Sequence, residues 1–216
     1  SFLVRLLPFY FRRKILMSFV VTESRIGTAK NALCHLFNIA DDLETVINER
    51  AMAYEGGVHP KHRLTHYHKF FVEQIPENAY VLDYGCGYGA LARSIALALP
   101  NTIVLGLDHN PKAIALAKTF QNPSNLSYLE ADNNLLGLPD FDWDIVVLSN
   151  VLEHIEDREL FLIDIQKTVK PKKILIRVPL FERDWKLPLR REVGANYYSD
   201  PDHKVEHTIE DFKMEM

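Results

Sequence analysis

Apolar positions in the middle of the chain fall into short runs, and stretches of helical composition lie between most of them. Short apolar runs bounded by polar or glycine-rich segments are typical of buried strands, and longer periodic stretches are typical of helices. This alternation predicts an α/β fold with a doubly wound parallel sheet and right-handed crossovers, whose ligands bind at the carboxyl ends of the strands. The runs are residues 80–82, 102–107, 126–129, 144–148 and 173–178, and helices are expected at 90–99, 111–120 and 158–169.

The region before the first run predicts helices only. Two are expected near residues 41–54 and 63–75, with a glycine pair between them. We therefore expect residues 1–75 to form an N-terminal helical extension or lid, and residues 76–216 to form the main domain.

The first 21 residues are rich in Phe, Leu and Val and also carry Arg5, Arg12, Arg13 and Lys14. No uninterrupted apolar run is long enough to span a bilayer, and Pro8 interrupts any long helix. Two interpretations remain open: a helical extension that packs on the domain, or a basic interfacial segment that makes peripheral membrane contact.

Residues 179–207 are polar, aromatic and irregular, which predicts a long loop on the ligand side of the sheet. Thr208 and Asp211 have the spacing of a capping box, so a short final helix should follow.

A glycine-rich turn follows the first apolar run. Gly85, Gly87 and Gly89 alternate after Asp83, and a predicted helix starts at Ala90. Glycines let the backbone come close to a ligand, and a helix N-terminus presents free N–H groups, so this turn is a candidate nucleotide cradle. The loose dinucleotide fingerprint is also satisfied. However, the Asp83 carboxylate would repel a pyrophosphate and would suit an ammonium group.

A second acidic residue, Asp108, ends the second run. Asn110 and Pro111 are a suitable N-cap and first residue for the next helix. Asp108, with His109 beside it, therefore lies at a strand end where carboxylates bind ribose hydroxyls. The alternative is an ordinary loop carboxylate.

The run D-x-G-C-G-x-G at residues 83–89 resembles the first motif of class I S-adenosylmethionine-dependent methyltransferases, a family with a Rossmann-like sheet. The resemblance covers about residues 80–180. It implies that the glycine turn holds the methionine part of the cofactor, that an acid after the third strand reads the adenine amino group, and that the segment after the fourth strand passes beneath the reacting centre. The implied cofactor-binding residues are Asp83, Gly85, Cys86, Gly87, Asp108, His109, Asp132, Asn133, Ser149 and Asn150.

Residues 152–155, Leu-Glu-His-Ile, resemble a feature of the small-molecule branch of this family, which includes quinone-biosynthesis enzymes. Members of the family usually add a C-terminal β-hairpin, for which no residues follow Met216. We therefore expect either a truncated chain or a sheet edge that is completed in another way.

His154 is the candidate catalytic residue. It titrates near neutrality and should lie at the cleft edge, where it could act as general base for an oxygen acceptor. The alternative is a histidine that packs or caps a helix.

A histidine cluster at His59, His62, His66 and His68 lies in the predicted lid. It lacks a nearby cysteine, an HExxH motif and a third ligand at fixed spacing, so no metal site is expected. His62, Arg63, His66 and Tyr67 are either lid residues over the cofactor or part of a polar helix surface.

Composition limits the classes of binding partner and the cellular compartment that we expect for this chain. A net charge of −4 argues against wholesale nucleic-acid binding, and two cysteines, Cys34 and Cys86, make a disulfide framework improbable and favour a reducing, cytoplasmic setting. The sequence thus predicts an enzyme that uses S-adenosylmethionine to methylate a small molecule, a lipid-like precursor or a sugar derivative. An NAD(P)-dependent oxidoreductase and a non-catalytic S-adenosylmethionine-binding domain remain the alternatives, and the acceptor atom and oligomeric state stay open.

Overall fold

The computed structural model describes residues 5–57, 59–131 and 137–216. The chain divides into two compact units: Ser1–Gly57 with Glu182–Tyr198, and Val58–Phe181 with Ser199–Met216. Residues 58–75, which the sequence placed with the N-terminal extension, thus group with the sheet. Residues 182–198 group with the N-terminal helices.

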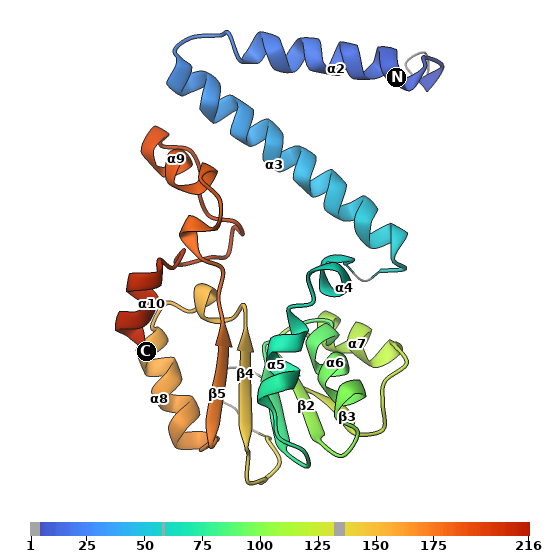
Figure 1. The fold of residues 1–216 in the computed structure, drawn as a ribbon, viewed down its shortest axis with the longest axis vertical. Helices are drawn as coiled ribbons and strands as arrows, with labels where there is room; N and C mark the ends of the chain where they lie inside the picture. Colours follow the sequence, from blue (N-terminus) through green and yellow to red (C-terminus); the bar gives the residue numbers. More distant parts are fainter. Residues whose placement is uncertain (1–4, 58, 132–136) are drawn as a thin grey trace. The chain divides into compact units, whose positions relative to one another are not determined.

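The larger unit is built on a five-stranded, all-parallel sheet in the order β3-β2-β1-β4-β5 (Figure 1), as the alternating pattern predicted. The strand order reverses between β2-β1 and β4-β5, so the carboxyl ends of β1 and β4 flank the point where such sheets bind ligands. The strands are β1 (Tyr80–Tyr84), β2 (Ile103–Asp108), β3 (Leu126–Glu130), β4 (Ile145–Ser149) and β5 (Lys173–Arg177).

Helices cover both faces of this sheet (Figure 1). The helices α5 (His68–Gln74), α6 (Ala90–Ala98) and α7 (Pro111–Thr119) cover one face, and α8 (Arg158–Thr168) and α10 (Ile209–Glu215) lie on the other. A short helix, α4 (Lys61–Thr65), precedes α5, and a 3-10 turn, η1 (Leu152–His154), follows β4.

Alternate residues of each strand supply two separate cores. Val81 packs with Ile95 of α6 in the first cluster, and Leu82 packs with Ile165 of α8 in the second. These four side chains are at most 1% exposed. Burying each one contributes roughly 1.5–3 kcal/mol, and this burial holds the strand ends in fixed positions.

The predicted caps are confirmed. The side chain of Asn110 accepts hydrogen bonds from the N–H groups of Lys112 and Ala113, and Pro111 occupies the first helical position. Asp157 caps α8 and Thr208 caps α10 in the same way. Each cap satisfies an N–H that the helix itself leaves unpaired, so each fixes where its helix begins.

The sequence predicted one continuous helix over residues 63–75, and this prediction was wrong. Helix α4 ends at Thr65, and His66 takes a left-handed φ of 51° before the chain enters α5. His62 and His66 therefore do not share a helix face.

The smaller unit contains α2 (Phe9–Glu23), α3 (Ala29–Tyr54) and α9 (Lys186–Val193). The irregular loop predicted for residues 179–207 was therefore wrong in part. The basic face of α9 is fixed by α3: Arg190 binds both carboxylate oxygens of Asp41 at 2.6 and 2.8 Å and stacks on the ring of Phe37. A pairing that joins residues 149 positions apart has no local sequence signal.

Helix α2 has no buried residue, and most of its apolar side chains are exposed. Within the described residues, no helix combines the length and the apolar character required to cross a bilayer.

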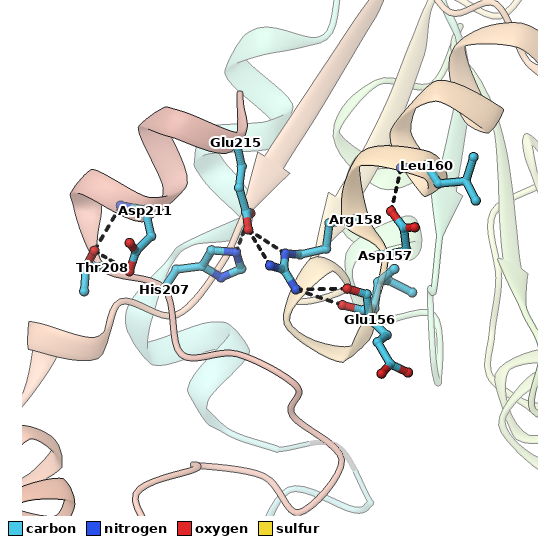
Figure 2. Close-up of polar contacts among 9 residues, drawn as sticks. Glu156, Asp157, Arg158, Leu160, His207, Thr208, Asp211 and Glu215 are labelled. Atoms are coloured by element: carbon cyan, nitrogen blue, oxygen red, sulfur yellow. Dashed lines mark hydrogen bonds and ion pairs between the residues drawn. The ribbon is translucent and has the colours of Figure 1, made fainter.

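A polar network joins α10 to α8 (Figure 2). The guanidinium of Arg158 donates to one carboxylate oxygen of Glu215, and the Nε2 atom of His207 lies 2.9 Å from the other. The side chain of His207 is fully buried. Its backbone forms an isolated parallel β-bridge with Leu180, just beyond β5. The described sheet contains parallel strands only.

Candidate active site

The glycine turn is held against β2 by main-chain hydrogen bonds. The N–H groups of Gly85 and Cys86 both donate to the carbonyl of Leu107, at 2.8 and 2.9 Å. The N–H of Gly87 donates to Oδ2 of Asp108 at 2.7 Å. Three successive N–H groups of the turn therefore donate to the last two residues of β2, and these bonds hold the turn at the carboxyl end of that strand.

Two of the glycines are required for different reasons. At Gly89 a Cβ would lie 2.6 Å from Cε1 of Tyr128, so packing alone forbids a side chain. At Gly87 φ is 52° and nothing lies within 4 Å of a Cβ position. A side chain at Gly87 would therefore project into open space above the turn, which is the space that a cradled ligand needs.

Asp83 is the most unusual polar residue of the larger unit. It lies in β1, is 2% exposed, and its Oδ2 atom has no hydrogen-bond partner among the described residues. Burial raises the pKa of Asp83 to about 7; a backbone hydrogen bond from Ala92 opposes the rise, and the charge of Asp108 adds to it. An unpartnered buried carboxyl is costly, so this site favours a cationic or donating ligand group.

Asp108 has both carboxylate oxygens in use. Oδ2 accepts from Gly87, and Oδ1 accepts from the N–H of Asn110 at 2.9 Å. Each oxygen has a second lone pair, so hydrogen bonds from ribose hydroxyls are still available to it. The ribose role remains a prediction, to which the structure adds a second role: Asp108 holds the glycine turn.

The other predicted cofactor residues take different positions. Cys86 packs against the first core cluster, and burial raises its thiol pKa far above the ordinary value. His109 is exposed beside Asp108, while Ser149 ends β4 and Asn150 follows it with a left-handed φ of 59°. Asp132 and Asn133 lie outside the described residues.

His154 ends η1, directly after β4, and is half-buried. Burial lowers its pKa below the ordinary 6.5, the positive charge of His203 lowers it further, and Asp200 and Asp202 oppose the shift. A neutral imidazole has one nitrogen that can accept a proton, which is the state a general base needs.

A polar cluster from residues 199–206 contacts η1, and the sequence did not predict it. The ring of His203 packs edge-on against that of His154 at 4.7 Å, and its Nδ1 lies 2.9 Å from Glu206. Glu206 also accepts from the N–H and hydroxyl of Ser199. These residues lie within the segment predicted as an irregular loop, and no local pattern pairs them with His154.

Three potential metal ligands meet in this place. One ligand atom from each of Glu153, His154 and His203 lies within 4.8 Å of the others. The sequence predicted no metal site, neither in the cluster at residues 59–68 nor after the fourth strand. The group at η1 was missed because His203 is 49 residues from His154 in the chain.

Two histidines of the predicted lid each lie within hydrogen-bond distance of a hydroxyl group. His62 Nδ1 lies 2.7 Å from the hydroxyl of Tyr67, and His68 Nδ1 lies 2.7 Å from the hydroxyl of Ser94. Burial is the largest cause that lowers the pKa of each histidine to about 4, and burial also raises the pKa of Tyr67. Both histidines are thus neutral near pH 7.

The class of domain follows from this arrangement and from its known relatives. A parallel sheet with a glycine turn after β1 and buried acids at the ends of its first two strands is the architecture of class I S-adenosylmethionine-dependent methyltransferases. Residues 82–176 match the family model described as a methyltransferase domain. Over these residues the chain is therefore similar to methyltransferase domains of this class, whose cofactor is S-adenosylmethionine.

Among curated relatives, the ubiquinone biosynthesis O-methyltransferase of Coxiella burnetii (strain RSA 493 / Nine Mile phase I) is 32% identical over 132 residues, which cover 60% of this chain and 55% of that protein. The enzyme of the same description from Rickettsia bellii (strain OSU 85-389) is 29% identical over 117 residues, covering 54% and 48%. The chain spans about half the length of the curated relatives it matches.

A solved structure supports the fold. Magnesium protoporphyrin IX methyltransferase from Synechocystis PCC 6803, solved with bound S-adenosylhomocysteine, aligns with a TM-score of 0.53 at 18% identity, covering 72% of this chain and 70% of that one.

Proposed function

We propose that this protein transfers a methyl group from S-adenosylmethionine to a small-molecule, lipid-precursor or sugar-derivative acceptor. The observation that carries the proposal is the Asp83 carboxyl, which is buried at the end of β1 before the glycine turn and has one oxygen without a partner among the residues that the structure describes. The ammonium group of a methionine moiety would give that oxygen a partner. The open space above Gly87 would receive the main chain of the same moiety.

The same feature weighs against a nicotinamide cofactor. A pyrophosphate at this turn would bring negative charge toward Asp83 and Asp108, and two of the N–H groups that would bind it are committed to Leu107. Dinucleotide sites instead leave such N–H groups free for phosphate.

When bound, S-adenosylmethionine supplies an electrophilic methyl group on a sulfonium. The protein then needs to hold an acceptor atom in line with it, and such orientation can contribute on the order of 7–11 kcal/mol. In this proposal His154 accepts the proton of an acceptor hydroxyl, since it ends the turn that follows β4 and its pKa lies below 6.5, so the ring is neutral near pH 7. The O-methyltransferase descriptions of the curated relatives favour a hydroxyl acceptor.

Calorimetry with S-adenosylhomocysteine and with NAD tests the cofactor. We expect S-adenosylhomocysteine to bind the wild-type protein and the Asp83→Ala variant to bind it at least about tenfold more weakly, since a hydrogen bond to a charged group is lost. Tight NAD binding that depends on Asp108 would overturn the proposal.

Transfer of a radiolabelled methyl group to a panel of phenols, sugars and prenylated phenols tests catalysis. S-adenosylhomocysteine binding without turnover on the panel would favour the non-catalytic alternative.

A further inference from the structure

Arg177 is the last residue of β5, at the same sheet edge as Asp83, and the function above does not use it. Its guanidinium carbon lies 4.3 Å from the centroid of the Tyr67 ring, and one of its amino groups donates to the side-chain oxygen of Asn150 at 2.6 Å. Its carbonyl accepts the N–H of Asn150 at 2.8 Å. Two neighbours therefore fix the orientation of a half-buried guanidinium.

The charge of Arg177 is not neutralised by any carboxylate among the described residues. No salt bridge joins it to an acid in the part of the chain that the structure describes. Among the groups around it, His62 and His68 are neutral near pH 7, and burial raises the pKa of Asp83 to about 7, so this carboxyl is ionised in only part of the molecules. A guanidinium has five N–H donors, and the described residues accept from one of its nitrogens only.

The position of Arg177 connects it to the site. Asn150 follows β4 directly, and the next residue, Val151, lies against Gly85 of the glycine turn. The pKa of Tyr67, whose ring carries the guanidinium, is affected by both Arg177 and Asp83. Arg177 thus borders the same edge of the sheet as the proposed cofactor position, on the β4–β5 side.

We propose that Arg177, oriented by Tyr67 and Asn150, is a binding site for a carboxylate group of a ligand of this enzyme. The unused edge of a guanidinium binds a carboxylate through two parallel hydrogen bonds, and stacking on an aromatic ring holds that edge in place. The carboxylate belongs either to an acidic acceptor or to the methionine moiety of the cofactor. Naming the acceptor and the cofactor as the two sources of the carboxylate rests on the proposed function. The anion site itself does not rest on that function.

The test uses Arg177→Gln, with Lys173→Gln as matched control. Lys173 begins the same strand at the opposite edge of the sheet and is exposed, and its ammonium group donates to the side-chain oxygen of Gln74, so Lys173→Gln removes the same charge away from the site. Arg177→Lys keeps the charge but not the two-point geometry. It also keeps the proposal testable if the glutamine variant folds poorly, which circular dichroism would reveal.

Binding is measured with two matched pairs of probes. S-adenosylhomocysteine has a carboxylate and 5′-methylthioadenosine lacks one; benzoate has a carboxylate and benzamide lacks one. If the cofactor supplies the carboxylate, Arg177→Gln weakens S-adenosylhomocysteine by roughly 10- to 100-fold and leaves methylthioadenosine unchanged. If the acceptor supplies it, cofactor affinity is unchanged, and benzoate binding to the cofactor-loaded protein, followed by ligand NMR, is lost while benzamide is unaffected.

The proposal is wrong if Arg177→Gln binds S-adenosylhomocysteine and benzoate as the wild type does. It is also wrong if the uncharged probes weaken as much as the charged ones, or if Lys173→Gln has the same effect. If the wild type binds no S-adenosylhomocysteine, the proposed function fails. Benzoate binding that requires Arg177 would still support the anion site in that case.

Discussion

The β1–β2 side of the site is built from main-chain groups, and the β4–β5 side is built from side chains. On the first side, the N–H groups of the glycine turn end on Leu107 and Asp108. On the second side, the ring of His154 packs against that of His203. The guanidinium of Arg177 stacks on Tyr67 and donates to Asn150. A main-chain cradle needs glycines and one carboxylate at fixed spacing, whereas a side-chain cluster can change one residue at a time. The first construction suits a constant ligand, and the second suits a ligand that differs between relatives.

The sharpest test of the β4–β5 side is His154→Ala. If His154 is the general base, kcat should fall about 10²- to 10⁴-fold while S-adenosylhomocysteine affinity stays nearly intact. The wild-type rate should fall only below pH 6.5, because burial lowers the pKa of His154 and the base must be neutral. Single-turnover methyl transfer across a pH series measures both effects, with exposed His35→Ala as control.

Two other outcomes are informative for His154. An unchanged kcat would contradict the base assignment. Loss of wild-type activity in a chelator, restored by magnesium, would show that the group formed by Glu153, His154 and His203 acts by holding a metal ion.

The corresponding test of the β1–β2 side is Gly87→Val. A branched residue at φ 52° is strained, and its side chain enters the open space above the turn, so S-adenosylhomocysteine affinity should fall on the order of 100-fold or more. Calorimetry measures the affinity and circular dichroism the fold. Gly194→Val is the matched control, because Gly194 also has a positive φ and open space but lies in the smaller unit. Equal losses in both variants would show that strain alone is responsible.

Asp108→Ala should weaken S-adenosylmethionine and S-adenosylhomocysteine alike, by about 1.5–3 kcal/mol, because hydrogen bonds to a charged group are lost. Asp108→Asn should lose less, since its amide oxygen can still accept from Gly87 or Asn110. Calorimetry with both ligands is the measurement. Unchanged affinity in the alanine variant would remove Asp108 from the cofactor site.

The smallest expected effect concerns the network that holds α10 to α8 on the β4–β5 side. Glu215→Gln should lower the free energy of unfolding by about 1 kcal/mol without changing cofactor affinity. Burial alone would raise the pKa of Glu215, but hydrogen bonds from Arg158 and His207 outweigh it and hold the pKa below 4.5. This contribution is therefore full above pH 4.5 and is lost as the pH falls through the lower folded-state pKa.

Urea unfolding at several pH values measures that contribution. Glu210→Gln, an exposed change on the same helix, is the control. A loss in the Glu210 variant as large as that in the Glu215 variant would contradict a specific role for the network.

The contrast between the two sides also explains which features the sequence could predict. The five strands, the caps at Asn110 and Thr208 and the glycine turn depend on local composition, so the pattern located them. The break of the lid helix at His66 had no such signal, because a non-glycine residue rarely takes a left-handed conformation and no glycine or proline marks the position. Helix α9 was missed for a similar reason, since Arg190 depends on Asp41 and Phe37 far along the chain.

Within the site, Asp83 and Asp108 could be located from strand ends, but their surroundings could not. No local pattern indicates that one oxygen of Asp83 is left without a partner, or that Asp108 accepts from Gly87. The same is true of Arg177, whose role depends on residues contributed by the lid and by the turn after β4. Contacts between distant side chains are fixed only by the assembled fold.

The buried carboxyl of Asp83 also has a consequence for the heat of cofactor binding. With its pKa near 7, about half of the free protein carries a proton on this group at neutral pH. An arriving ammonium group favours the ionised form, so we expect each binding event to expel a fraction of a proton into the buffer, a fraction that grows as the medium becomes more acidic. The measured enthalpy should then change with the ionisation enthalpy of the buffer. Acidification by one unit should weaken apparent affinity by up to about tenfold, which would couple this enzyme's saturation to the acidity of its surroundings.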